Sequence, residues 1–209
     1  QGGSTVQDIT VSIIEYNEAP VITSLDGNYS SNYMNFDEFC QRALNLKNLP
    51  LPGEVSHYKM SPTLRIQWLK ENNIEKANPK RAGVMALFYP DMEQQTRLLL
   101  ILRKVYEGVH SNQIGFPGGK VEEQDKDLLA TALRETQEEV GVLPSTVQII
   151  KELSEVYIPP SNFMVHPYLA WADGPLKMIP EEKEVAAIHR IALDRFLAED
   201  AISVRPIKM

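Results

Sequence analysis

Three glutamates of this chain have types and spacings that suit a divalent metal ion. Glu135 and Glu139 are four residues apart and Glu138 follows Glu135 by three, so a helix would place them on one face. Like charges at such spacings destabilise a helix by about 0.2–0.5 kcal/mol per pair, and anions near its C-terminus oppose the helix dipole. A hard cation such as Mg²⁺ prefers carboxylate oxygen and would reverse both effects. The spacing alone therefore leaves two interpretations open, a site for a divalent cation such as Mg²⁺ and a solvated acidic face.

The segment that carries these glutamates is predicted to be a helix over 128–140. Asp127 can cap its N-terminus, Gly141 ends it, and Pro144 prevents it from resuming. Residues at helical spacing are expected to face the core, namely Leu129, Leu133 (or Ala132), Thr136 and Val140. A Gly-Gly turn at 118–119 is expected ahead of the helix, within reach of its glutamates.

These residues together resemble the sequence box of the Nudix hydrolase family. In that box a glycine and an isolated glutamate precede Arg-Glu-apolar-x-Glu-Glu-x-Gly-apolar. The matching residues are Gly119, Arg134, Glu135, Glu138, Glu139, Gly141 and Val142. This chain has one residue more between Gly119 and Arg134, so Asp125 or Lys126 replaces the isolated glutamate, depending on the end from which the box is counted. Thr136 stands where the box has an apolar residue.

The resemblance implies both a fold and a chemistry. The fold is α/β, a Nudix-type α/β/α sandwich around a mixed β-sheet, preceded here by an N-terminal helical lead-in. The chemistry is hydrolysis of a diphosphate with Mg²⁺ or Mn²⁺ as cofactor. Glu135 and Glu139 are the first candidates for metal ligands, and Glu138 completes the set. The carbonyl of Gly118 or Gly119 could ligate as well, because glycine lets the backbone approach a cation closely.

Further roles follow from the same resemblance. Arg134 is expected to orient Glu135 through an ion pair, with direct contact to substrate as the alternative. One carboxylate is expected to act as base toward the attacking water. Glu135, Glu138 and a downstream acid all qualify, and Glu184 is the best placed of the downstream acids because Glu-Val precedes an apolar run there.

The residues ahead of the box resemble the signature of the coenzyme A pyrophosphatases within the Nudix family. The residues that fit are Leu99, Leu100, Arg103, His110, Gln113, Ile114, Phe116, Pro117, Gly118 and Gly119. Lys104, Glu107 and Asn112 depart from it. The implied substrate is coenzyme A or an acyl-CoA, cleaved to 3′,5′-ADP and a 4′-phosphopantetheine. The alternatives are another nucleoside diphosphate derivative (ADP-ribose, NADH or a dinucleotide), a nucleotide sensor without turnover, and an acidic-face scaffold.

Candidate substrate contacts lie around this signature. Arg103 and Lys104 end a predicted strand and are expected either to hold phosphates or to face solvent as strand-end cations. His110 is expected either to contact a phosphate or to anchor its loop, and Gln113 belongs to the same substrate-binding set. The loop 157–163 is aromatic and proline-rich, and it is either a substrate wall or, more commonly for such loops, hydrophobic packing.

Composition limits the class of protein. The 209 residues are 43% apolar, which suffices for one core with an appendage, and the net charge of −7 argues against nucleic acid as the main partner. A small-molecule nucleotide remains compatible with that charge. A single cysteine, Cys40, excludes an internal disulfide and suits a reducing, cytoplasmic location. No apolar run is long enough for a membrane span, and no membrane partner is expected. The protein could act alone or as a homodimer.

The chain divides into three predicted parts. Residues 1–33 lack Lys and Arg and are expected to lie outside the core fold, as an edge hairpin (11–14 with 21–23) or as a segment foreign to the natural chain. Residues 34–80 form the helical lead-in, with helices at 36–46 and 64–72. Residues 81–209 form the hydrolase domain, with strands at 82–89, 96–103, 114–116, 147–158, 163–172 and 185–191 and a closing helix at 193–198.

Overall fold

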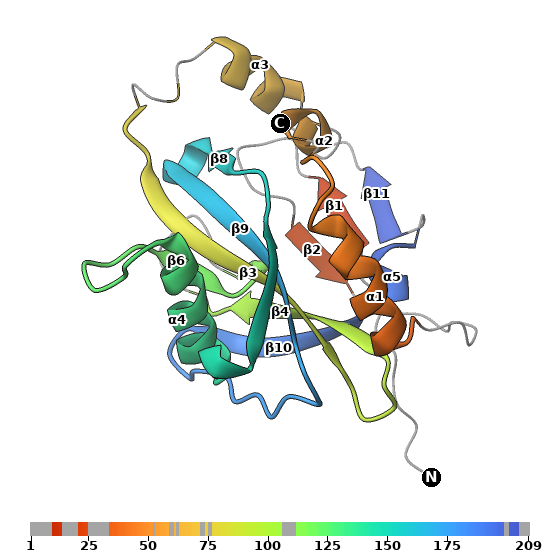
Figure 1. Cartoon of the computed structure of the whole chain (residues 1–209). Coiled ribbons are helices and arrows are strands. Elements are labelled where there is room, and N and C mark those ends of the chain that lie inside the picture. Colours follow the sequence, from red (N-terminus) through yellow and green to blue (C-terminus); the bar gives the residue numbers. More distant parts are fainter. Residues whose placement is uncertain are drawn as a thin grey trace.

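A mixed β-sheet of eight strands is the centre of the computed structural model (Figure 1). The structure describes residues 10–13, 21–24, 34–51, 53–58, 61, 63–71, 74, 77–105, 112–198 and 201–204. The main path of the sheet runs β10 (Val185–Ala192), β4 (Thr96–Arg103), β3 (Lys80–Pro90), β9 (Phe163–Ala172) and β7 (Val147–Glu152). Three short strands pair beside it: β5 (Ile114–Gly115) with β4, β6 (Gly118–Lys120) with β3, and β8 (Val156–Ile158) with β9.

Both faces of the central strands are buried, which explains their continuous apolar sequences. On β3, Met85 and Leu87 belong to a core cluster that includes Ala132 and Val140 of helix α4 (Leu128–Val140). The alternate residue Phe88 belongs to a second cluster with helix α1 (Phe36–Leu46). Side chains of a strand alternate between faces, so one helix covers each side. The predicted α/β/α sandwich over a mixed sheet is confirmed.

Helix α4 lies directly on the strand that carries the site. Asp127 caps it by accepting a hydrogen bond from the Ala130 N–H at 2.7 Å, and Gly141 ends it in the left-handed conformation with φ of 75°. A side chain at Gly83 of β3 could not fit beneath the helix, because its Cβ would lie 2.2 Å from the Leu128 carbonyl oxygen. The predicted bounds of this helix and both its capping residues are confirmed.

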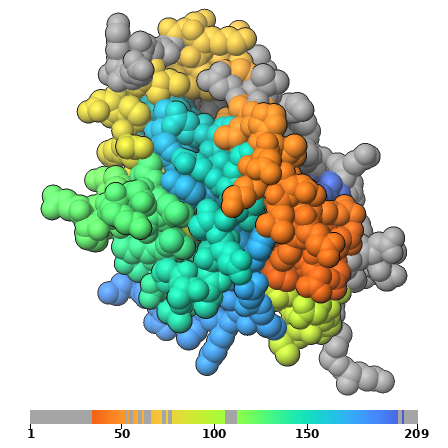
Figure 2. Space-filling model, viewed as in Figure 1, coloured from red at the N-terminus to blue at the C-terminus, as the bar shows by residue number. Residues whose placement is uncertain are grey.

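Helix α1 forms the layer on the opposite face. Phe39 is buried, and its ring centroid lies 4.8 Å from that of Phe88. At the C-terminal end of the helix, the Lys151 ammonium donates to the carbonyls of Leu46, Lys47 and Leu49. Figure 2 shows the orange α1 segment lying against the teal segment that includes β7. The lead-in thus contributes a structural layer, followed by the short helices α2 (Glu54–Tyr58) and α3 (Thr63–Glu71).

Two predicted elements were wrong. Gly118-Gly119 is the short strand β6 rather than a turn, because it pairs antiparallel with 82–84 of β3. The single strand predicted over 147–158 is divided into β7 and β8. The break lies opposite Pro167 of β9, which has no N–H to donate and only accepts a hydrogen bond from Leu153.

A second, smaller sheet contains the two N-terminal strands. β1 (Thr10–Ile13) and β2 (Val21–Ser24) pair antiparallel, as predicted, and β11 (Ile202–Val204) joins β1 in parallel. Neither β11 nor α2 was predicted from the sequence. The closing helix α5 (Leu193–Phe196) is shorter than its predicted range. Within the described residues, the helices are all too short or too polar to cross a lipid bilayer.

Candidate active site

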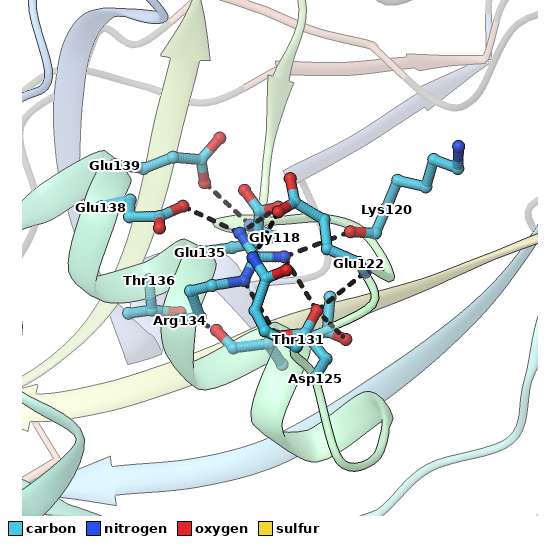
Figure 3. A network of polar contacts seen from close by, with 12 residues as sticks. Gly118, Lys120, Glu122, Asp125, Thr131, Arg134, Glu135, Thr136, Glu138 and Glu139 are labelled. Carbon is cyan, nitrogen blue, oxygen red and sulfur yellow. Dashed lines mark hydrogen bonds and ion pairs between the residues drawn. The ribbon is translucent and has the colours of Figure 1, made fainter.

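Glu139 lies near the C-terminal end of α4 and is directed at Gly118 of β6 (Figure 3). Arg103, the last residue of β4, lies on its other side. Its side chain is 1% exposed, and its Oε2 accepts a hydrogen bond from the Gly118 N–H at 2.8 Å. The other oxygen, Oε1, is 3.2 Å from Nη1 of Arg103, yet it is buried and accepts no hydrogen bond of acceptable geometry from the residues described. A buried carboxylate oxygen without a hydrogen bond is costly, and a cation ligated there would remove that cost.

The surroundings of Glu139 oppose its negative charge. Burial raises the pKa of Glu139 to about 7, although the charge of Arg103 and the Gly118 N–H both act to lower it. The charges of Glu135 and Glu184 raise this pKa further. Three carboxylates are therefore close enough to repel one another, which is the electrostatic environment that a divalent cation would relieve.

Glu135 lies one turn earlier on α4, against Gly119 of β6. A Cβ at Gly119 would be 2.4 Å from Cδ of Glu135, so no other residue type fits there while the carboxylate keeps this position. Burial raises the pKa of Glu135, against the charge of Arg134. The absence of a side chain at Gly119 thus leaves the space that the Glu135 carboxylate occupies. Ligation by the glycine carbonyl stays a prediction.

Arg134 organises the other carboxylates of the site. Its Nη1 donates to Glu135 at 3.0 Å and to Glu138 at 2.8 Å. Its Nε and Nη2 donate to the two oxygens of Asp125 at 2.9 and 3.0 Å, and Nη2 also reaches the Lys120 carbonyl. The predicted ion pair with Glu135 is present, and Glu138, 58% exposed, is held by the same guanidinium.

Asp125 anchors this network from the loop before α4. Its side chain is 3% exposed and also accepts hydrogen bonds from the Thr131 hydroxyl and the Glu122 N–H. The Arg134 guanidinium holds the pKa of Asp125 well below its usual range. The sequence left Asp125 and Lys126 as alternatives for the isolated acid of the box, and the structure places Asp125 in the network while Lys126 is exposed.

The residues predicted to bind substrate have different surroundings. Arg103 is directed at Glu139 and donates from Nη2 to the Gly118 carbonyl at 2.6 Å, a contact that sequence reasoning missed. The Lys104 side chain is exposed. Its backbone N–H donates to the Glu184 carbonyl at 2.8 Å, which holds the Glu184 backbone beside the end of β4. The Gln113 carbonyl accepts from the Arg103 N–H at 2.9 Å. His110 lies outside the described residues.

The loop 157–163 is fixed by packing. The Tyr157 ring is stacked 5.9 Å from that of Trp68 on α3, and its hydroxyl donates to Oδ1 of Asn162 at 2.9 Å. The Asn162 side chain donates in turn to the Ala77 carbonyl at 3.0 Å. Of the two interpretations drawn from the sequence, these contacts favour hydrophobic packing over a substrate wall.

The residue types around Glu139 fit a divalent cation. Carboxylates, glycine carbonyls and the buried Oε1 of Glu139 are hard oxygen donors, which Mg²⁺ and Mn²⁺ prefer. In the part of the chain described, however, no three His, Cys, Asp or Glu side chains converge on one point. The reason lies in the two arginines: Arg134 holds Glu135 and Glu138, while Arg103 faces Glu139.

Comparison with known proteins gives the family. Residues 79–208, more than half of the chain, match the model of the NUDIX domain. The chain belongs to the Nudix family. It is 34% identical over 134 residues to the uncharacterized Nudix hydrolase NudL of Escherichia coli, covering 64% of this chain and 68% of that one. It is 33% identical over 128 residues to Nudix hydrolase 15, mitochondrial, of Arabidopsis thaliana, covering 60% of this Nudix chain but only 45% of the plant protein.

Solved structures of this family are similar only distantly. RenU, a Nudix hydrolase from M. smegmatis, is 18% identical with a TM-score of 0.47, covering 56% of this chain and 73% of that one. The NUDIX domain of Shewanella oneidensis NrtR, solved with ADP ribose, is 20% identical with a TM-score of 0.45, covering 63% and 85%.

Proposed function

We propose that this chain hydrolyses the diphosphate bond of a small nucleotide derivative with Mg²⁺ or Mn²⁺. The observation that carries the proposal is Glu139, a buried carboxylate beside a glycine strand with one oxygen that accepts no hydrogen bond. Its place in a complete Arg-Glu-x-x-Glu-Glu set within a Nudix domain supports the same chemistry. A cation bound there would neutralise the phosphate oxygens as charge develops in the transition state.

The ligands that we propose are Glu135 and Glu139, with Glu138 as the third and the carbonyl of Gly118 or Gly119 as a backbone donor. Glu135 and Glu139 lie one turn apart on α4, where Glu139 is buried and the Glu135 side chain is only 14% exposed. Glu138 is exposed and would have to leave Arg134 to join them. In this proposal Arg134 positions the carboxylates, since its guanidinium already contacts Asp125, Glu135 and Glu138.

The base toward the attacking water is one of three carboxylates. Glu135 and Glu138 lie on α4, and Glu184 lies immediately before β10, where its carbonyl accepts a hydrogen bond from the backbone N–H of Lys104. The charge of Glu184 raises the pKa of both Glu135 and Glu139, and its backbone lies beside the end of β4, on an element separate from α4. We propose that Glu184 serves as base if Glu135 and Glu138 are both engaged as ligands.

Coenzyme A or an acyl-CoA is the substrate that we propose, with 3′,5′-ADP and a 4′-phosphopantetheine as products. The support is the signature whose matching residues run from Leu99 to Gly119. Its last residues enter the site directly, because Met85 donates to the Pro117 carbonyl at 2.9 Å and Gly118 and Gly119 pair with β3. Arg103, Lys104, His110 and Gln113 are the residues that we propose to contact the substrate.

Product analysis tests this proposal. The purified protein is incubated with Mg²⁺ or Mn²⁺ and with coenzyme A, ADP-ribose, NADH or a diadenosine polyphosphate, and phosphate-containing products are separated and identified. We expect 3′,5′-ADP from coenzyme A, and a Glu139→Gln variant of unchanged fold with at least about a hundredfold lower kcat, the scale on which one electrostatic contact to the transition state acts. Turnover of another nucleotide would support diphosphate hydrolysis but reject coenzyme A as the substrate. Metal binding without any turnover would favour a nucleotide sensor.

A further inference from the structure

The guanidinium of Arg103 bridges two oxygens that the proposed cation would also use. Its Nη2 donates to the Gly118 carbonyl at 2.6 Å, and its Nη1 is 3.2 Å from Oε1 of Glu139. Glu139 reaches the same place from α4, so β4, β6 and α4 meet at this one side chain. Arg103 thus connects the carboxylate with the glycine backbone across three elements.

The contact at Glu139 is an incomplete one. Although Nη1 lies within ion-pair distance, Oε1 accepts no hydrogen bond from the described residues. A well-formed arginine–carboxylate pair usually has two parallel hydrogen bonds. Here Nη2 of the guanidinium donates to the Gly118 carbonyl instead. The positive charge of Arg103 therefore lies close to Glu139, but Oε1 of Glu139 still lacks a hydrogen bond from the described residues. A smaller divalent cation could approach both oxygens more closely and would remove the remaining cost.

We propose that Arg103 competes with the divalent cation for Glu139 and the Gly118 carbonyl, and that it is a positioning residue which holds these oxygens until the cation enters. Two cationic groups cannot share the same pair of oxygens, so entry of the cation releases the guanidinium. A released guanidinium is then available to a substrate phosphate, which links cation binding to substrate binding. The inference rests on the proposed function, because it requires that Glu139 and the Gly118 carbonyl are cation ligands.

Mn²⁺ binding in the absence of substrate tests the competition. Free Mn²⁺ is measured by electron paramagnetic resonance during titration of the wild-type protein, Arg103→Gln and Lys104→Gln. We expect Arg103→Gln to lower the Mn²⁺ dissociation constant roughly tenfold, the equivalent of one charge-assisted contact that no longer opposes binding. Lys104→Gln is the control for simple loss of positive charge. Its side chain is exposed and screened by solvent, so its effect should be much smaller.

Several outcomes would overturn the inference. A folded Arg103→Gln protein with unchanged or weaker Mn²⁺ affinity would show that Arg103 does not compete. If Lys104→Gln bound Mn²⁺ as much more tightly as Arg103→Gln does, the effect would come from the lower net charge and not from competition. If Arg103→Gln does not fold, Arg103→Lys replaces it. Lysine has a single ammonium group in place of the forked guanidinium and cannot bridge the two oxygens in the same way. The Mn²⁺ affinity of Arg103→Lys should therefore exceed that of the wild type, and an unchanged affinity would reject the competition. Substrate is absent throughout, so failure to hydrolyse any diphosphate would reject the proposed function separately.

Discussion

At the scale of single residues, Glu139 shows how a candidate ligand can oppose the stability of its own fold. The side chain is almost fully buried, and its neighbours include two further carboxylates. Burial is the largest influence on its pKa and exceeds the opposing influence of Arg103. The folded protein therefore favours the protonated form of Glu139 more than the unfolded chain does, which makes stability depend on pH.

A denaturation experiment at two pH values isolates this effect. The pKa of Glu139 rises from 4.5 to about 7 on folding, so between these values the folded protein holds a proton that the unfolded chain releases. The free energy of unfolding must then fall as pH rises through this window, by roughly 3 kcal/mol from this group. Urea denaturation at pH 5 and pH 8, with EDTA present, should show a decrease that is larger in the wild type than in Glu139→Gln by about that amount. Equal decreases would mean that burial of Glu139 has no net electrostatic cost.

At the scale of elements, the contact between α4 and β3 places the carboxylates against the glycine strand. Gly83 lies beneath Leu128 and Ala132 at the start of the helix, while Glu135 lies over Gly119 further along. Gly83 and Gly119 are register partners on β3 and β6. Two glycines on adjacent strands thus allow the helix to lie close to the sheet along the length that carries the site.

Gly83→Ala should disturb this contact. Its Cβ would be 2.2 Å from a backbone oxygen of α4, which cannot move without moving the helix. We expect a loss of about 1–3 kcal/mol in the free energy of unfolding, the usual cost of overpacking, together with weaker Mn²⁺ binding. Guanidinium denaturation and a Mn²⁺ titration measure the two effects. Gly115→Ala is the matched control, because a Cβ there has no heavy atom within 4 Å and both properties should stay unchanged. Equal behaviour of the two variants would contradict the close contact.

Sequence reasoning was most accurate where the signal is local. The bounds of α4, β4 and β9 were predicted to the residue, because caps, prolines and changes in apolar pattern mark their ends. It was wrong for β6, since glycines are rare in strands and pairing with β3 depends on a distant segment. The contact of Arg103 with Glu139 was missed for the same reason. Arg103 ends β4 and Glu139 lies near the end of α4, and the two are far apart in the sequence. A sequence pattern does not show that such distant residues come together in the fold.

At the scale of the whole molecule, α1 is the layer that completes the sandwich. Its residues Phe36, Phe39 and Ala43 pack with Phe88, Leu98 and Leu100 of the sheet. The sheet residues that face α1 alternate with those that face α4, so both helical layers share the same strands. The segment 34–46 is therefore expected to unfold together with the Nudix domain.

Phe39→Ala tests whether α1 and the sheet form one cooperative unit. Phe39 is 6% exposed, and its removal should lower the free energy of unfolding by about 3–5 kcal/mol, as for other buried aromatic residues. Fluorescence and circular dichroism should still report a single transition. Leu44→Ala on the same helix is the control, since Leu44 is 56% exposed and its loss should change stability by less than about 0.5 kcal/mol. An early, separate transition of α1 would instead mean that it is only an appendage.

The two-sided burial of β3 also restricts how this protein can change over evolutionary time. Odd-numbered residues from Met85 to Tyr89 face the layer of α4, and Ala86 and Phe88 face the layer of α1. Insertion or deletion of a single residue would exchange these two sets, because strand side chains alternate with a period of two. A large side chain such as Leu87 would then meet the space that Ala86 fills on one side, while Ala86 would leave part of the space of Leu87 empty on the other. Length changes in this lineage should accordingly be found in the connections, as in the extra residue of the loop before α4, and not in β3.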